Sequence, residues 1–137
     1  MTKDQKERIE MLPDEQKEKF IKEYELLVQG GYVPKDAEIE IRLYHAEGLI
    51  NDEEVTRLIM ILFKEEEVVR NITADQVMRI NQLKGNRADV MMVAYQMAKD
   101  KGKEPTELEV ELMILRAKGK LTSPEVRKIQ YLNKNQK

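Results

Sequence analysis

Apolar and polar residues follow one another along this chain mostly with the period of an α-helix. Val90, Val93, Ala94 and Met97, for example, recur at the spacing i, i+3, i+4 and i+7, which places them on one helical face. Glycine and proline fall between such segments, where they end helices or form turns. The pattern predicts an all-α protein with about eight short helices, over residues 3–11, 14–29, 35–47, 52–69, 73–83, 87–100, 106–118 and 123–133.

Helix-capping residues mark several of the predicted boundaries. Thr2 and Thr73 each precede a predicted helix, and Gln5 and Gln76 follow them three residues later. This spacing is typical of a capping box, in which the hydroxyl and the amide each bind a backbone N–H group. Gly48 follows the third predicted helix, where glycine adopts the left-handed conformation that ends a helix at little cost.

The chain contains an internal repeat. Residues 2–66 align with residues 73–137 without a gap, and 15 of the 65 aligned positions are identical. The identical pairs are Thr2/Thr73, Asp4/Asp75, Gln5/Gln76, Arg8/Arg79, Ile9/Ile80, Leu12/Leu83, Tyr24/Tyr95, Gly31/Gly102, Pro34/Pro105, Glu38/Glu109, Glu40/Glu111, Ala46/Ala117, Gly48/Gly119, Glu54/Glu125 and Val55/Val126. The repeat predicts a tandem duplication of a four-helix unit, with repeat one in residues 1–70 and repeat two in residues 71–137. We expect the repeats to share a core, as one compact helical bundle or a short α-solenoid-like array.

Two segments leave a short strand pair open as an alternative. Residues 37–43 and 108–114 alternate apolar and mostly charged positions, as a half-buried strand does. A helix explains the same pattern, because Ala37 and Ile41 then share one face and Ile39 lies on the opposite one. A helix that is apolar on two faces is expected to pack on both sides.

The two repeats differ on their second and fourth helices. A largely charged face of the second helix becomes apolar in repeat two, and an apolar face of the fourth helix becomes polar there. The residues that form these two apolar stripes are the candidate interface: Ile59, Leu62, Phe63, Val90, Val93, Ala94 and Met97. Either the stripes pack on each other and join the repeats, or the stripe of the sixth helix forms an exposed groove for a partner helix.

Charge is unevenly distributed between the two halves. Residues 1–70 carry 11 Lys or Arg and 18 Asp or Glu, a balance of −7, and residues 71–137 carry 13 and 8, a balance of +5, which together give the net charge of −2. The complementary charges suit mutual attraction of the two halves, a head-to-tail homo-oligomer, or a basic face that binds an acidic partner. Five basic residues near the last helix–turn–helix are candidates for contacting phosphate: Arg116, Lys118, Lys120, Arg127 and Lys128.

The sequence offers no recognisable catalytic or metal site. Cysteine is absent, which excludes disulfides and thiolate ligands, and His45 is the only histidine. The chain contains no glycine-rich phosphate loop, nucleophile elbow or zinc-binding HExxH motif. We therefore expect no enzymatic activity, no cofactor and no bound metal.

The remaining features favour a protein of the cytoplasm. The first residues are charged, unlike a signal peptide, and the longest apolar run, Leu58–Phe63, is too short to cross a bilayer. We expect no membrane partner. The sequence favours a non-enzymatic protein–protein interaction module, such as an adaptor, regulator or inhibitor, that acts through helical surfaces. The alternative is a nucleic-acid-associated regulatory protein that uses the basic second half.

Overall fold

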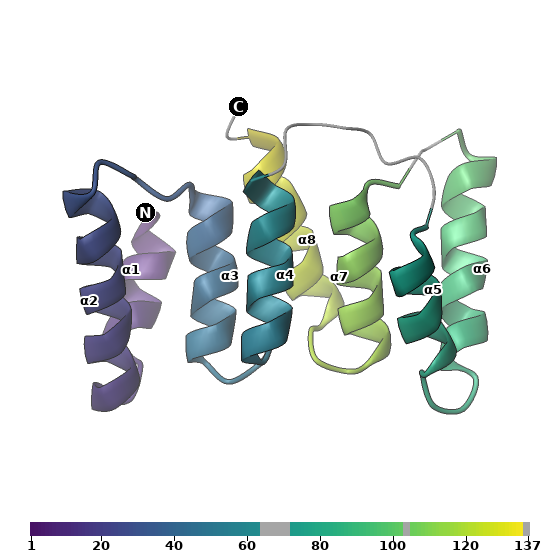
Figure 1. The fold of residues 1–137 in the computed structure, drawn as a ribbon, viewed down its shortest axis with the longest axis horizontal. Coiled ribbons are helices and arrows are strands. Elements are labelled where there is room, and N and C mark those ends of the chain that lie inside the picture. Colours follow the sequence, from purple (N-terminus) through teal and green to yellow (C-terminus); the bar gives the residue numbers. More distant parts are fainter. Residues whose placement is uncertain (64–71, 103–104, 136–137) are drawn as a thin grey trace. The chain divides into compact units, whose positions relative to one another are not determined.

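The chain is helical in the part that the structure describes. The computed structural model describes residues 1–63, 72–102 and 105–135, and it contains no strand within these ranges. The helices (Figure 1) are α1 (Lys3–Glu10), α2 (Asp14–Gln29), α3 (Asp36–Ala46), α4 (Asp52–Phe63), α5 (Ala74–Asn81), α6 (Arg87–Asp100), α7 (Glu107–Ala117) and α8 (Ser123–Asn135). The all-α prediction is confirmed. Residues 64–69, predicted as the end of the fourth helix, lie outside the described residues.

Both predicted capping boxes are present. The backbone N–H of Gln5 donates to the hydroxyl of Thr2 at 3.1 Å, and the N–H of Thr2 donates to the side-chain oxygen of Gln5 at 3.0 Å. Thr73 and Gln76 form the same reciprocal pair at the start of α5, with both distances 3.1 Å. Each box satisfies two N–H groups, neither of which has a hydrogen-bond partner within the helix.

The end of α3 is a Schellman motif at Gly48. The N–H of Gly48 donates to the carbonyl of His45 at 3.0 Å, and the N–H of Leu49 donates to the carbonyl of Tyr44 at 2.9 Å. Gly48 has a φ of 82°, a conformation that glycine adopts without the steric penalty of a Cβ atom. The helix therefore ends at the residue that the sequence predicted to stop it.

The alternative of a strand pair is wrong, because residues 37–43 and 108–114 lie within α3 and α7. The alternating pattern has a different cause. Apolar residues on both faces of α3 are buried, such as Ile39 and Ile41, and the carboxylates of Glu38 and Glu40 are buried as well. Glu38 and Glu40, which lie between the apolar positions, are thus hydrogen-bonded in the interior and do not face solvent.

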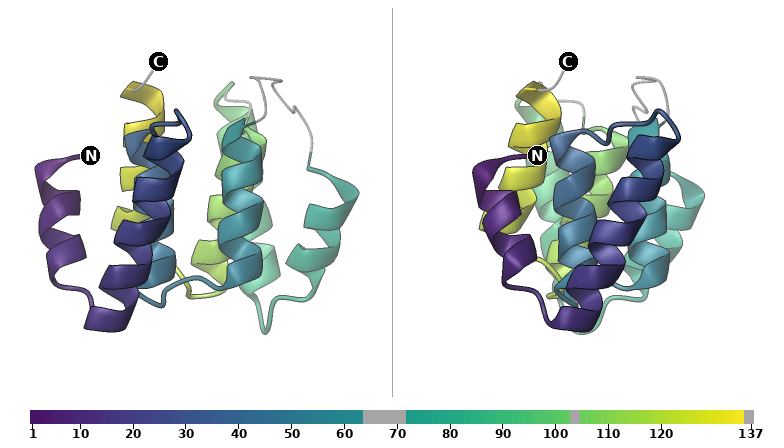
Figure 2. Two further views of the ribbon diagram at one scale, coloured as in Figure 1. Left: turned by 60° about the vertical axis from the view of Figure 1, so that its left-hand side comes forward. Right: turned by 90° about the vertical axis from the view of Figure 1, so that its left-hand side faces the viewer.

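The described residues form two compact units. The first comprises Met1–Ile59 together with Lys128–Lys137, and the second comprises Met60–Arg127. In the first compact unit α1, α2 and α3 pack against one another, as the views in Figure 2 show. Their shared core is apolar and consists of Ile9, Leu12, Phe20, Ile39 and Leu43. Burying each of these side chains stabilises the fold by about 1.5 to 3 kcal/mol.

The second compact unit has a corresponding core. Here α7 packs against both α5 and α6. The buried cluster consists of Ile80, Met91, Tyr95, Val110 and Ile114. Four of these residues lie 71 positions after a member of the first cluster, and Tyr95 lies 71 positions after Tyr24, which packs at the edge of that cluster. The two sets of helices thus use the same positions of the repeat for their cores.

A buried polar network joins α1 to α3. The amide of Gln5 donates to a carboxylate oxygen of Glu40 at 3.1 Å and to the carbonyl of Asp36 at 2.9 Å. Arg8 donates to the other oxygen of Glu40 at 2.5 Å and to Glu47 at 2.6 Å. Burial alone would lower the pKa of Arg8, but the hydrogen bonds to Glu47 and Glu40 outweigh it and raise the pKa above its ordinary value. The carboxylate of Glu40 is fully buried. The cost of burying its charge is offset by the guanidinium group of Arg8 and by the hydrogen bonds from Arg8 and Gln5.

The same network recurs between α5 and α7. Gln76 donates to Glu111 at 3.1 Å and to the carbonyl of Glu107 at 3.4 Å. Arg79 donates to both carboxylate oxygens of Glu111 at 2.5 Å, and it also pairs with Asp75 at 2.9 Å. The hydrogen bond to Glu111 is the main reason that the pKa of Arg79 is raised, and burial opposes the shift. Gln76, Arg79, Glu107 and Glu111 each lie 71 positions after a residue of the first network. Asp75 corresponds to Asp4, which lies 3.4 Å from Arg8, whereas Glu47 has no acidic counterpart in the second network.

Candidate functional site

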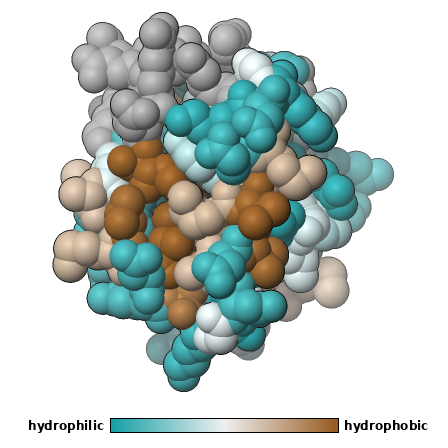
Figure 3. Space-filling model, turned by 90° about the vertical axis from the view of Figure 1, so that its right-hand side faces the viewer, coloured by the Kyte–Doolittle hydropathy of each residue, from teal (hydrophilic) through white to brown (hydrophobic). Residues whose placement is uncertain are grey.

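The second compact unit carries exposed apolar side chains on α5 and α6. Six of them form what we call the α5–α6 surface: Val77, Met78, Val90, Met92, Val93 and Met97. Val93 and Met97 are 59% and 53% exposed. Figure 3 shows this side of the molecule, where hydrophobic residues gather in the middle and hydrophilic residues border them. Apolar side chains that cluster on a surface mark sites of interaction more often than single exposed ones do.

A groove lies next to Val90, between α6 and α7. Its volume is about 310 Å³. We call it the α6–α7 groove, and it is lined by Asn86, Arg87, Val90, Met91, Ala94, Met113, Arg116 and Ala117. The lining combines apolar side chains, among them the half-buried Met113, whose flexible side chain can adapt to a partner, with two guanidinium groups.

The two arginines of the groove carry charges that no carboxylate of the described residues neutralises. Within the described part of the chain, the side chain of Arg87 forms no hydrogen bond or ion pair. With the described residues, Arg116 makes only a long hydrogen bond of 3.4 Å, to the hydroxyl of Ser123. Both residues are exposed. The groove therefore presents, beside apolar side chains, two positive charges that no carboxylate in the described part of the chain neutralises.

The corresponding positions of the first compact unit are different in character. Val90, Ala94 and Met113 line the groove, and the residues 71 positions before them are charged: Lys19, Glu23 and Arg42. Arg42 donates to Glu38 at 2.9 Å, so its charge is compensated locally. His45, the counterpart of Arg116, has its Nε2 atom 2.6 Å from a carboxylate oxygen of Asp52. Of these two equivalent places, only the one on the second compact unit combines an apolar lining with guanidinium groups that no carboxylate of the described residues neutralises.

The structure brings together residues that the sequence placed in two separate candidate sets. Val90 and Ala94 were candidates for a protein interface, Arg116 was a candidate for contacting phosphate, and all three line the α6–α7 groove. Arg87 and Met113 were missed. Periodicity within one helix gives no signal for them, because the groove exists only once α6 and α7 are packed together.

The other residues of the candidate interface are distributed over two helices. Val93 and Met97 lie on α6 and are exposed. On α4, Ile59 and Leu62 are half-buried and Phe63 is 57% exposed.

The other candidate phosphate contacts do not share one environment. Lys128 of α8 forms an ion pair with Asp4 of α1, and its Nζ atom lies 3.8 Å from Glu40. The hydrogen bond from Lys128 holds the pKa of Asp4 below its ordinary value, although burial acts in the opposite direction. Lys118 is half-buried, whereas Lys120 and Arg127 are exposed. A phosphate would have to compete with Asp4 for Lys128, and that residue is therefore a poor candidate.

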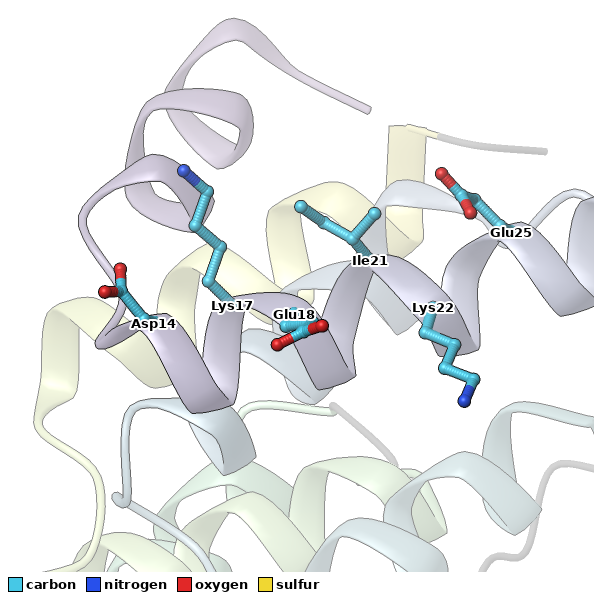
Figure 4. Close-up of a pocket in the computed structure, with 6 residues that line it drawn as sticks. All are labelled: Asp14, Lys17, Glu18, Ile21, Lys22 and Glu25. Atoms are coloured by element: carbon cyan, nitrogen blue, oxygen red, sulfur yellow. The ribbon is translucent and has the colours of Figure 1, made fainter.

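A second depression runs along α2 and has no convergent chemistry. Figure 4 shows its lining residues, Asp14, Lys17, Glu18, Ile21, Lys22 and Glu25, which all come from this one helix. Their side chains point in different directions along α2 and do not meet at one place. Lys17 pairs with Glu10 at 2.7 Å, and Ile21 packs against the core of the first compact unit. Lys17 and Ile21 are therefore engaged in structural contacts of the first compact unit.

The acidic residues in the interior are occupied by structural contacts. Glu38 accepts hydrogen bonds from the hydroxyl of Tyr32 at 2.5 Å and from Arg42 at 2.9 Å. Burial and the carboxylate of Glu38 raise the pKa of Tyr32 to about 12. Within the described ranges, every buried side-chain nitrogen or oxygen has a hydrogen-bond partner. The same residues contain no group of three or more histidine or acidic side chains placed to hold a metal ion.

Comparisons with known proteins assign this chain to no family. No protein-family model, curated protein or solved structure matches the chain. Among the described residues, no helix has both the length and the apolar character needed to cross a membrane.

Proposed function

We propose that this chain is a non-enzymatic protein–protein interaction module, such as an adaptor, a regulator or an inhibitor. It binds its partner through the α5–α6 surface of the second compact unit. The observation that carries the proposal is the exposure of Val93 and Met97, which are more than half exposed on one face of α6. Helical faces of this kind are a common means of recognising proteins, and flexible methionines adapt to the partner.

The proposal includes an origin by tandem duplication, in which two four-helix repeats, joined as one bundle or short array, have diverged in surface chemistry. It is supported by helix bounds that coincide at a shift of 71 positions for α1 with α5 and for α3 with α7. The equivalent networks around Glu40 and Glu111 support it as well. In this proposal the charged face of α2 keeps the ancestral surface character, and α6 has acquired an apolar one.

Two further observations favour a protein-binding role, one over catalysis and one over nucleic-acid binding. The buried carboxylates of Glu40 and Glu111 are engaged with arginine and glutamine side chains and are therefore not free for acid–base chemistry. A nucleic-acid partner is favoured less, because Lys128 is paired with Asp4.

The test uses two substitutions at equivalent positions of the repeat. Val93→Asp places a charge on the α5–α6 surface, and Lys22→Asp places the same residue at the corresponding position of α2, 71 residues earlier. We expect both variants to keep the helical circular dichroism and the melting temperature of the wild type, because both positions are exposed. Proteins cross-linked to the wild type in the native host and identified by mass spectrometry should be lost with Val93→Asp and retained with Lys22→Asp.

A second variant keeps the test decisive if Val93→Asp alone disturbs folding. Met97→Lys lies on the same face of α6, one turn further along the helix, and is expected to have the same effect on binding. The proposal fails if both α6 variants retain every protein that the wild type captures. It also fails if both variants unfold, because the apolar stripe would then be an internal seam of the protein.

A further inference from the structure

The α6–α7 groove has features that define the chemistry of its occupant. This inference rests on the proposed function, since it specifies the partner of the same surface. The groove is continuous with the α5–α6 surface through Val90, which is 56% exposed and belongs to both. Its volume of about 310 Å³ is at the lower end of the range for ligand pockets, roughly 300 to 1,000 Å³. A space of this size suits a few side chains of a docked segment better than a large cofactor.

The apolar side chains indicate a helical segment. Val90, Ala94 and Met97 follow one another at helical spacing along α6, so the apolar stripe extends over two helical turns, about 10 Å. A partner helix that lies along this stripe presents its own apolar residues at positions i, i+3, i+4 and i+7. Met91 at the base of the groove is 4% exposed and belongs to the core, which gives the site a fixed floor.

The arginines indicate the charge of that segment. Arg87 at the start of α6 and Arg116 in the last turn of α7 both line the groove, and neither is neutralised by a carboxylate of the described residues. Bringing a cationic segment to this place would add like-charge repulsion. Carboxylates beside the apolar residues would instead form guanidinium–carboxylate hydrogen bonds, which are among the stronger pairings in proteins.

We propose that the α6–α7 groove binds an acidic amphipathic helix of a partner protein. The apolar face of that helix packs on Val90, Ala94 and Met113, and its Asp or Glu residues pair with Arg87 and Arg116. The equivalent place on the first compact unit does not bind such a helix, because Lys19 and Glu23 make it polar and Arg42 is already paired with Glu38.

The experiment is a selection of helical peptides from a display library on the immobilised full-length protein. The probe is the library itself, in which the apolar spacing is fixed and the flanking positions are random. We expect the enriched peptides to carry Asp or Glu at the flanking positions and to bind less tightly as the salt concentration rises. The double variant Arg87→Glu/Arg116→Glu should weaken their binding about tenfold or more. The matched control, Lys19→Glu/Lys22→Glu on α2, changes the net charge by the same amount at exposed positions and should bind as the wild type does.

The result separates this inference from the proposed function. Enriched peptides that depend on Val93 and Met97, but not on Arg87 and Arg116, would overturn the acidic-helix inference and leave the proposed function standing. A library that yields no peptide dependent on either set overturns the inference, while the cross-linking experiment with Val93→Asp decides the proposed function separately.

Two other occupants would also overturn the inference. Sedimentation of the protein without peptide detects a second copy in the groove, as a dimer that the double variant dissociates. Titration with a random single-stranded DNA or RNA detects a nucleic acid, as binding that falls steeply with salt and is lost in the double variant.

Discussion

The guanidinium group of Arg79 lies 2.5 Å from both carboxylate oxygens of Glu111, and Glu111 is only 3% exposed. This pair joins α5 to α7 in the interior of the second compact unit. Removing one partner leaves the other charge buried without full compensation, which typically costs about 3 to 5 kcal/mol. We expect Glu111→Gln to lower the free energy of unfolding by about 3 kcal/mol, measured by denaturation in urea.

A double-mutant cycle isolates this pair from its surroundings. Arg79→Met combined with Glu111→Gln should be less destabilised than the sum of the single changes, because neither charge is then left alone. The exposed pair of Arg57 and Glu53, 2.7 Å apart on α4, is the matched control. Its cycle should give a coupling of about 0.5 kcal/mol or less. Equal coupling in the two cycles would contradict the structural role of the buried pair.

Two adjacent glycines after α2 should respond in opposite ways to the same substitution. Gly31 has a φ of 87°, whereas Gly30 has a φ of −76°. A Cβ atom added at Gly30 would lie 3.5 Å from two backbone oxygens, which is ordinary contact. Gly30→Ala should therefore stabilise the protein by about 0.4 to 1 kcal/mol through the unfolded chain, and Gly31→Ala should destabilise it by about 1 kcal/mol or more. The melting temperatures of the two variants test this, and a shift of the same sign in both would contradict it.

Much of the fold could be predicted because its signals are local. A capping box such as that of Thr2 and Gln5 spans four residues, and a stop such as Gly48 acts within one helical turn. The amphipathic period, which predicted the helices, is likewise a signal between residues that are close in the sequence. The sequence left a strand pair open as an alternative because it does not tell whether Glu40 faces solvent or pairs with an arginine inside the fold. Its partner Arg8 lies 32 positions away, and no local pattern connects the two.

The candidate site was predictable only in part, for a related reason. The apolar stripe of α6 follows from periodicity, and its contrast with α2 follows from the repeat. Arg116 was a candidate for contacting phosphate because its neighbours in the sequence are basic. Its actual surroundings are Met113, one turn earlier on α7, and Ala94, which the packing of α6 on α7 supplies. Lys128 likewise pairs with Asp4, 124 positions away, a relationship that charge counting along the chain does not reveal.

Two adjacent methionines on α6 should differ in their reactivity toward hydrogen peroxide. Met91 is 4% exposed and belongs to the core, whereas Met92 is 40% exposed on the α5–α6 surface. Oxidation to the sulfoxide follows the exposure of the sulfur-bearing side chain, so we expect Met92 to react several-fold faster than Met91. Peptide mapping by mass spectrometry after a short exposure to peroxide gives both rates. In urea the two rates should become equal, and equal rates in the native protein would show that this face of α6 is not arranged as described.

The stability of the protein should fall between pH 10 and pH 12 because of Tyr32. Burial and the carboxylate of Glu38, which accepts a hydrogen bond from the phenol hydroxyl at 2.5 Å, raise the pKa of Tyr32 from 10 to about 12. Between these values the folded protein keeps a proton that the unfolded chain has lost, so this contribution to stability is complete below pH 10 and is lost as the pH rises through 12. The tyrosinate absorbance of the native protein should show one group titrating late. Tyr32→Phe should remove that step, and Glu38→Gln should move it to lower pH. A native titration curve that coincides with the curve in denaturant would contradict the hydrogen bond between Tyr32 and Glu38.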